Sequence, residues 1–129
     1  MKTGRGAAAL HRIGEGAIFE GELRFSGRLE VDGQVVGAVI AEPPEGSEVV
    51  VGPKGRIQGP VIAASVLVAG RIEGSIKAGI RLEVAAGARV RGEIVYRDLQ
   101  VQHGAVLEGS LLPAEGGQVA LKLVANSRN

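Results

Sequence analysis

Side chains that could perform chemistry are few and far apart in this chain of 129 residues. It contains two histidines, His11 and His103, and no cysteine, so one copy cannot supply a three-histidine zinc site, a thiolate ligand or a thiol nucleophile. Asp32 and Asp98 have no histidine or serine at the spacing of a catalytic motif, and no phosphate-binding GxxxxGK[ST] loop occurs. We therefore predict no enzyme, with no catalytic, metal-binding or cofactor-binding residue.

The charge balance also narrows the class of protein. Lysine and arginine total 15 and aspartate and glutamate total 14, which argues against a nucleic-acid partner because such proteins usually carry a basic excess. No apolar run approaches the roughly 18 residues of a membrane span, and no secretory leader is recognisable. We expect a cytoplasmic protein.

A short phrase that contains two glycines recurs along the chain, as GAIFEGEL, GRIEGSI and GAVLEGSL. Its second glycine is Gly21, Gly37, Gly59, Gly74, Gly92 and Gly109, at spacings of 16, 22, 15, 18 and 17 residues. The longest interval contains the insertion-like segment EPPEGS, Glu42–Ser47. Repetition at this period is typical of a solenoid and is not expected of a β-sandwich, the alternative all-β fold.

Large apolar residues stand two positions before and two positions after every one of these glycines, and a second set of apolar residues alternates between the phrases. A period of two predicts β-strands, and no segment has the sustained 3.6-residue period and caps of a helix. Because one unit cannot bury its own apolar face, the units must stack. The sequence thus predicts an all-β, single-domain parallel β-helix of about six coils over residues 13–112, roughly 25–30 Å long.

Residues 1–12 and 113–129 lie outside the repeat, and we expect them to be flexible tails. The segment QVALKLV in the second tail carries four large apolar residues. Three arrangements stay open for it: a solvated tail, a cover over the last coil, or a docking segment for a partner.

The first and last coils are more apolar than the middle ones. Ile18 and Val106 occupy an aligned position that is polar or charged in the middle coils, namely Gln34, Arg56, Arg71 and Arg89. Monomeric solenoids usually carry polar caps at their ends. We therefore predict end-to-end stacking through Ile18, Phe19 and Leu23 at one end and Val106, Leu107 and Leu111 at the other. The alternative is that the two tails cover the ends.

Two sets of outward-facing residues each allow two interpretations. Val50, Leu67, Ile40, Ile62 and Val95 fall at outward positions that are apolar, which indicates either a lateral or partner interface or a surface covered by the insertion or a tail. Arg56, Arg71 and Arg89 share one aligned position and should stack on successive coils. This ridge is either a solvated, salt-bridged face or a contact for an anionic partner or a membrane surface.

The phrases IGEGAIFEGEL, LEVDGQVVGAV, AGRIEGSIKAG and LEVAAGARVRGEI resemble those of bactofilins, and the likeness extends from Ile13 to Leu111, 99 residues. The resemblance implies a bacterial cytoskeletal protein with a right-handed β-helix and flexible tails. It implies a homopolymer filament that forms without nucleotide through contacts between terminal coils and that localises cell-wall enzymes or other cytoskeletal partners. It further implies peripheral contact with the inner face of the cell membrane, for which Ala8, Ala9 and Leu10 are the available apolar residues.

The alternative function is that of a hexapeptide-repeat enzyme, an acyltransferase or γ-type carbonic anhydrase on a left-handed β-helix. That class has one aliphatic residue in every six, whereas aliphatic residues here are paired two or four apart. The scarcity of histidine also disfavours it. An ice-binding or adhesin solenoid would need threonine ladders or a secretion signal, and Thr3 is the only threonine.

Overall fold

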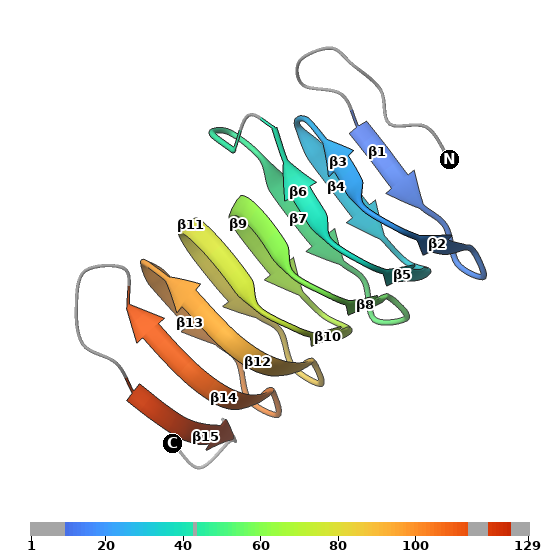
Figure 1. The fold of residues 1–129 in the computed structure, drawn as a ribbon. Helices are drawn as coiled ribbons and strands as arrows, with labels where there is room; N and C mark the ends of the chain where they lie inside the picture. The colour runs from blue at the N-terminus through green and yellow to red at the C-terminus, as the bar shows by residue number, and fades with distance from the viewer. Residues whose placement is uncertain (1–9, 43, 114–118, 125–129) are drawn as a thin grey trace.

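The computed structural model describes residues 10–42, 44–113 and 119–124, and within these it contains fifteen β-strands and no helix (Figure 1). Side chains are described for residues 11–42 and 44–113. The chain winds through about six turns of a parallel β-solenoid, as the sequence predicts. Each turn contributes a strand segment to three faces, which we number in chain order.

Face 1 is formed by β1 (Leu10–Ile13), β4 (Arg28–Val31), β7 (Glu48–Val51), the second halves of β9 (Val61–Val68) and β11 (Ile76–Val84), and β13 (Asp98–Val101). Face 2 is formed by β2 (Ile18–Glu20), β5 (Gln34–Val36), β8 (Arg56–Gln58), β10 (Arg71–Glu73) and the first parts of β12 (Arg89–Tyr96) and β14 (Val106–Pro113). Face 3 is formed by β3 (Leu23–Phe25), β6 (Val39–Ala41) and the remaining parts of β9, β11, β12 and β14. Coil pairs with coil in parallel on every face.

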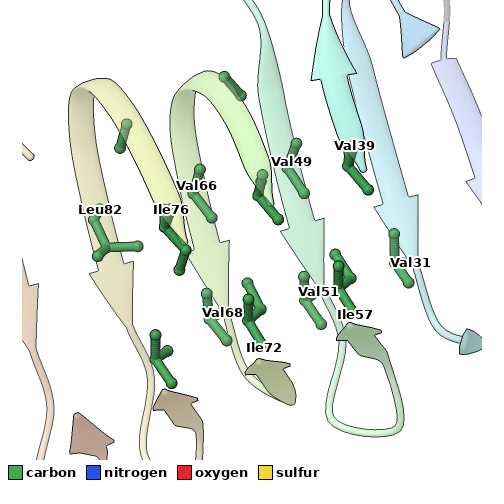
Figure 2. Close-up of a cluster of buried hydrophobic side chains, with 14 of the residues drawn as sticks. Val31, Val39, Val49, Val51, Ile57, Val66, Val68, Ile72, Ile76 and Leu82 are labelled. Atoms are coloured by element: carbon green, nitrogen blue, oxygen red, sulfur yellow. The ribbon is translucent and has the colours of Figure 1, made fainter. Parts of the chain in front are cut away.

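The core is a stack of aliphatic side chains that point inward from the three faces (Figure 2). Of the twelve apolar residues that flank the repeated glycines, all are buried except Phe19, which is half-buried. Successive coils place equivalent residues in register, as with Ile57 and Ile72 on face 2. Since each fully buried Val, Leu or Ile contributes about 1.5–3 kcal/mol, this stack can hold the coils together with few aromatic residues.

The repeated glycine marks the corner between face 2 and face 3, where the chain turns with a positive φ, 144° at Gly74 and 137° at Gly92. A Cβ on Gly92 would overlap the carbonyl group of Gly74 in the preceding coil, and one on Gly74 would overlap that of Gly59. The corner therefore requires glycine for two reasons, its backbone conformation and the close approach of the next coil.

The paired region is longer than the repeat recognised in the sequence. β1 begins at Leu10, inside the predicted N-terminal tail, and pairs in parallel with β4. β15 (Val119–Val124), inside the predicted C-terminal tail, pairs antiparallel with β14 over six register pairs. The structure thus shows the covered arrangement of the last coil among the three left open for this segment (Figure 1).

The insertion of the second coil is anchored by a buried serine. Ser47 is 2% exposed; its hydroxyl donates to the carbonyl oxygen of Pro44 at 2.5 Å and accepts the backbone N–H of Ala64 at 2.9 Å. Ala64 lies in β9 of the next coil. The same side chain therefore holds the insertion in place and satisfies a buried donor of the adjacent turn.

Candidate functional site

In the described part of the chain, the N-terminal end of the solenoid has unpaired strand edges on all three faces. Within the described residues, β1 pairs only with β4, β2 only with β5, and β3 only with β6. The outer edges of these strands carry backbone N–H and C=O groups that no described strand satisfies. Such edges are templates for pairing with another chain.

Two apolar residues of β2 lie beside this open edge. Ile18 is 64% exposed, the largest exposure among the large hydrophobic residues of the described part. Its column on face 2 continues through Gln34, Arg56, Arg71 and Arg89 to Val106, as the alignment predicts. Phe19 is half-buried, whereas the residues that follow it in its inward column are at most 1% exposed.

At the C-terminal end the edges are partly covered. β14 has β12 on one side and β15 on the other, so both of its edges are paired. β13 pairs only with β11 within the described residues, and its Leu99 and Val101 are partly buried against the core. Over the residues that the structure describes, the two ends therefore differ: one has three open strands and the other has an open strand on face 1 alone beside the covering strand β15.

The residues predicted to form the stacking interface fall into two groups. Ile18, Phe19 and Val106 keep accessible surface, whereas Leu23 and Leu107 are 1% exposed and Leu111 is 6% exposed. The second group belongs to the core of the subunit. Sequence alignment could not separate the groups because both follow the same apolar pattern.

The apolar outward residues form pairs, not a continuous strip. Val50 pairs with Leu67 on face 1, and Glu30 and Glu83 flank the pair. Ile40 pairs with Ile62 on face 3, and Lys77 separates Ile62 from Val95. All five of these hydrophobic residues are half-buried. Of the residues predicted to contact a membrane, Ala8 and Ala9 lie outside the described residues, and of Leu10 only the backbone is described.

The predicted arginine ridge is present on face 2. Arg71 lies in register with Arg56 on one side and Arg89 on the other. Arg56 pairs with Glu73 at 3.6 Å, whereas Arg71 and Arg89 make no ion pair within the described residues. The ridge is salt-bridged at one position and carries unpaired positive charge at the other two.

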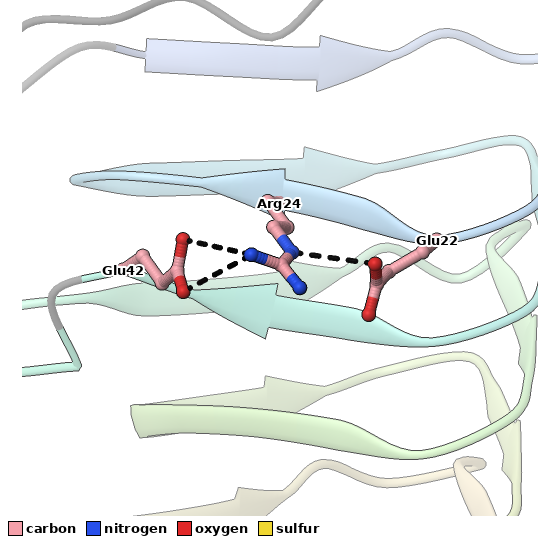
Figure 3. Close-up of polar contacts among 3 residues, drawn as sticks. All are labelled: Glu22, Arg24 and Glu42. Atoms are coloured by element: carbon pink, nitrogen blue, oxygen red, sulfur yellow. Dashed lines mark hydrogen bonds and ion pairs between the residues drawn. The ribbon is translucent and has the colours of Figure 1, made fainter.

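Ion pairs between coils are common elsewhere on the surface. Arg24 of β3 lies between Glu22 at 3.3 Å and Glu42 of the next coil at 3.3 Å, and its hydrogen bond to Glu22 with the charges of both carboxylates raises the pKa of Arg24 (Figure 3). Lys54 donates to Glu15 at 2.8 Å, which raises the pKa of Lys54. This bond joins the corners of the first and third coils.

The buried position of His11 is the feature that the sequence did not predict. His11 is an inward residue of β1, in register with Leu29, and it is 8% exposed. Its ring contacts Phe25 edge to face, with 6.5 Å between the ring centroids, and its Nε2 atom has no hydrogen-bond partner among the described residues. His103 is exposed at the turn before Gly104. No group of three or more His, Asp or Glu residues in the described ranges could hold a metal ion.

Taken together, the fold defines a parallel β-solenoid protein with a solid aliphatic core and strand edges left open at its ends. The family model for bactofilin, described as polymer-forming cytoskeletal, matches residues 11–112, so this chain belongs to the bactofilin family. This confirms the resemblance seen in the repeat phrases. Comparison with curated proteins and with solved structures gave no match. No helix among the described residues is long and apolar enough to cross a membrane.

Proposed function

We propose that this chain is the subunit of a cytoskeletal filament that assembles without nucleotide, by end-to-end stacking of solenoids. The observation that carries the proposal is the open end formed by β1, β2 and β3, with the exposed Ile18 beside it. Membership of a polymer-forming family supports it.

The driving forces in this proposal are strand pairing and apolar burial. A second solenoid placed against the open end would satisfy the edge N–H and C=O groups and would remove Ile18 and the accessible part of Phe19 from water. Neither step requires hydrolysis or a bound cofactor. The stacked copies would continue the spacing of about 4.8 Å between strands that already relates the coils within one subunit.

A filament of this kind is suited to act as a scaffold at the inner face of the cell membrane. Each outward column would repeat once in every subunit, so weak contacts with cell-wall enzymes or other cytoskeletal partners would be strengthened by avidity. The same multiplication would apply to a weak membrane contact through Ala8, Ala9 and Leu10 in the N-terminal segment. These partners and this cytoplasmic location are part of the proposal.

The test compares two aspartate substitutions in buffer that lacks nucleotide and metal. Ile18→Asp places a short charged side chain beside the open end, and Ile80→Asp is the matched control because Ile80 is 57% exposed but lies in the middle of the rod, on β11. Ile18→Asp removes the burial of one isoleucine from the contact between subunits, which contributes about 1.5–3 kcal/mol. The concentration needed for assembly of this variant should therefore rise by about tenfold or more. Sedimentation and negative-stain electron microscopy measure the polymer. Absence of filaments from the unmodified chain, or equal assembly of both variants, would count against stacking through this end.

A further inference from the structure

β15 differs from every other strand in its direction of pairing. All the other strand pairs are parallel and join equivalent segments of successive coils, whereas β15 returns along β14 in the antiparallel sense. Its six register pairs run from Val106 with Val124 to Leu111 with Val119. β15 therefore does not continue the solenoid but ends it on faces 2 and 3.

A β-strand has two edges, and both edges of β14 are in use. One is paired with β12 over eight residues and the other with β15 over six. A second copy of this chain that docks on faces 2 and 3 of this end by pairing with β14 needs the edge that β15 holds. This is true whichever end of the second copy approaches, because β14 has no other edge to offer.

We propose that β15 is a displaceable cap, which occupies the docking surface for a second copy of this chain on faces 2 and 3 and must leave β14 before a second copy can pair there. The inference rests on the proposed function, since it takes the partner to be another subunit. A docking coil can pair with β13 and β14 together, whereas β15 pairs with β14 alone. Among the described strands β15 is also held on one edge only, so exchange for a second copy increases the number of paired strands.

A disulfide across the β14–β15 pair tests the proposal in the full-length chain. Ser110 and Ala120 are register partners, and directly opposed residues of an antiparallel pair lie at a Cα separation that a disulfide can span. The natural sequence contains no cysteine, so S110C/A120C can form one intramolecular bond only. Its matched controls are the same protein under reductant and the S110C single variant. Mobility on a non-reducing gel verifies that the bond lies within one chain.

A second variant opens the cap without shortening the chain. Successive N–H groups of a strand point to opposite edges, so L121P/K122P removes one donor that faces β14, whichever residue provides it. Circular dichroism checks that the solenoid remains folded. Assembly is measured by sedimentation and electron microscopy, as a function of subunit concentration.

The expected result is that oxidised S110C/A120C loses sedimenting filaments, that reductant restores them to the level of the unmodified chain, and that L121P/K122P assembles at lower concentration than the unmodified chain. Equal assembly of the oxidised and reduced double variant would overturn the cap and leave the proposed function standing. If the unmodified chain, the reduced double variant and L121P/K122P all fail to form filaments, the proposed function itself is wrong.

Discussion

Gly92 and Gly74 lie in adjacent coils so close together that a Cβ on Gly92 would stand 2.7 Å from the carbonyl carbon of Gly74 and nearer still to its oxygen. The N–H of Gly74 in turn donates to the carbonyl of Arg91, directly before Gly92, at 2.8 Å. The corner is therefore a column of glycine backbones in contact, and the coil spacing at this corner depends on the missing side chains.

Substitution within this column should be far more damaging than substitution of glycine elsewhere. Gly92→Ala combines a positive φ with a backbone overlap and should lower the free energy of unfolding by about 2–5 kcal/mol. Gly87→Ala has a positive φ of 84° but open space, and should cost about 1–2 kcal/mol. Gly79→Ala has neither feature and should change stability by less than about 0.5 kcal/mol. Urea denaturation of the three variants measures the order; equal losses would mean that coil contact is unimportant.

Replacement of His11 should stabilise the first coil. Its Nε2 atom is buried, with no partner among the residues that the structure describes, at a position that is leucine or valine in the next four coils. His11→Leu removes the desolvated nitrogen and extends the aliphatic column, so the free energy of unfolding should rise by about 1–3 kcal/mol. Thermal unfolding followed by circular dichroism gives the comparison, with His103→Leu as the control on an exposed turn. A lower melting temperature for His11→Leu would show that this imidazole has a partner in solution.

Ser47 should matter more to stability than a surface serine does. Ser47→Ala leaves the buried N–H of Ala64 without an acceptor, and we expect a loss of about 1–3 kcal/mol. Ser75→Ala is the control, because Ser75 is exposed on the corner before β11. Hydrogen exchange at Ala64 should accelerate in the first variant only. An unchanged exchange rate at Ala64 would argue that water replaces the hydroxyl.

The stability of the solenoid should depend on the sign of the charge at the centre of the arginine ridge, at Arg71. Arg71→Glu places a carboxylate between Arg56 and Arg89 and should raise stability at low salt by about 0.2–1 kcal/mol for each new pair. Arg81→Glu should lower the free energy of unfolding, because the new carboxylate would face Asp98, with which Arg81 forms an ion pair at 3.6 Å. Added salt should diminish both differences. If Arg71→Glu were destabilising at low salt, an anion bound by the ridge in solution would be the explanation to pursue.

Much of the fold was predictable because the glycines and the apolar residues report the same geometry. Glycine is required where coils approach at the corner, and the apolar residues two positions away on either side must point inward. His11 escaped prediction because a histidine interrupts the apolar column of Leu29 and Val49, although LHRI stands eighteen residues before RLEV in register. A search for that spacing would have found β1.

The ends were harder to predict, for a physical reason. Leu107 and Leu111 follow the same pattern whether they face a second subunit or a strand of their own chain, so burial at the end depends on what covers it. The segment from Val119 to Val124 is short and apolar, which suits a covering strand and a solvated tail equally well at the level of composition. Only its pairing with β14 decides between them.

The direction of the hydrogen bonds gives this rod an unequal response to force. Because strands are paired from coil to coil on three faces, the bonds that join two coils run along the long axis of the solenoid. Tension along that axis loads the hydrogen bonds of all three faces between two coils together. A force applied sideways would break these hydrogen bonds one face at a time. A cytoskeletal element with this construction is stiff in stretching. Its mechanical failure should begin by bending between the two coils whose strand pairs are the shortest.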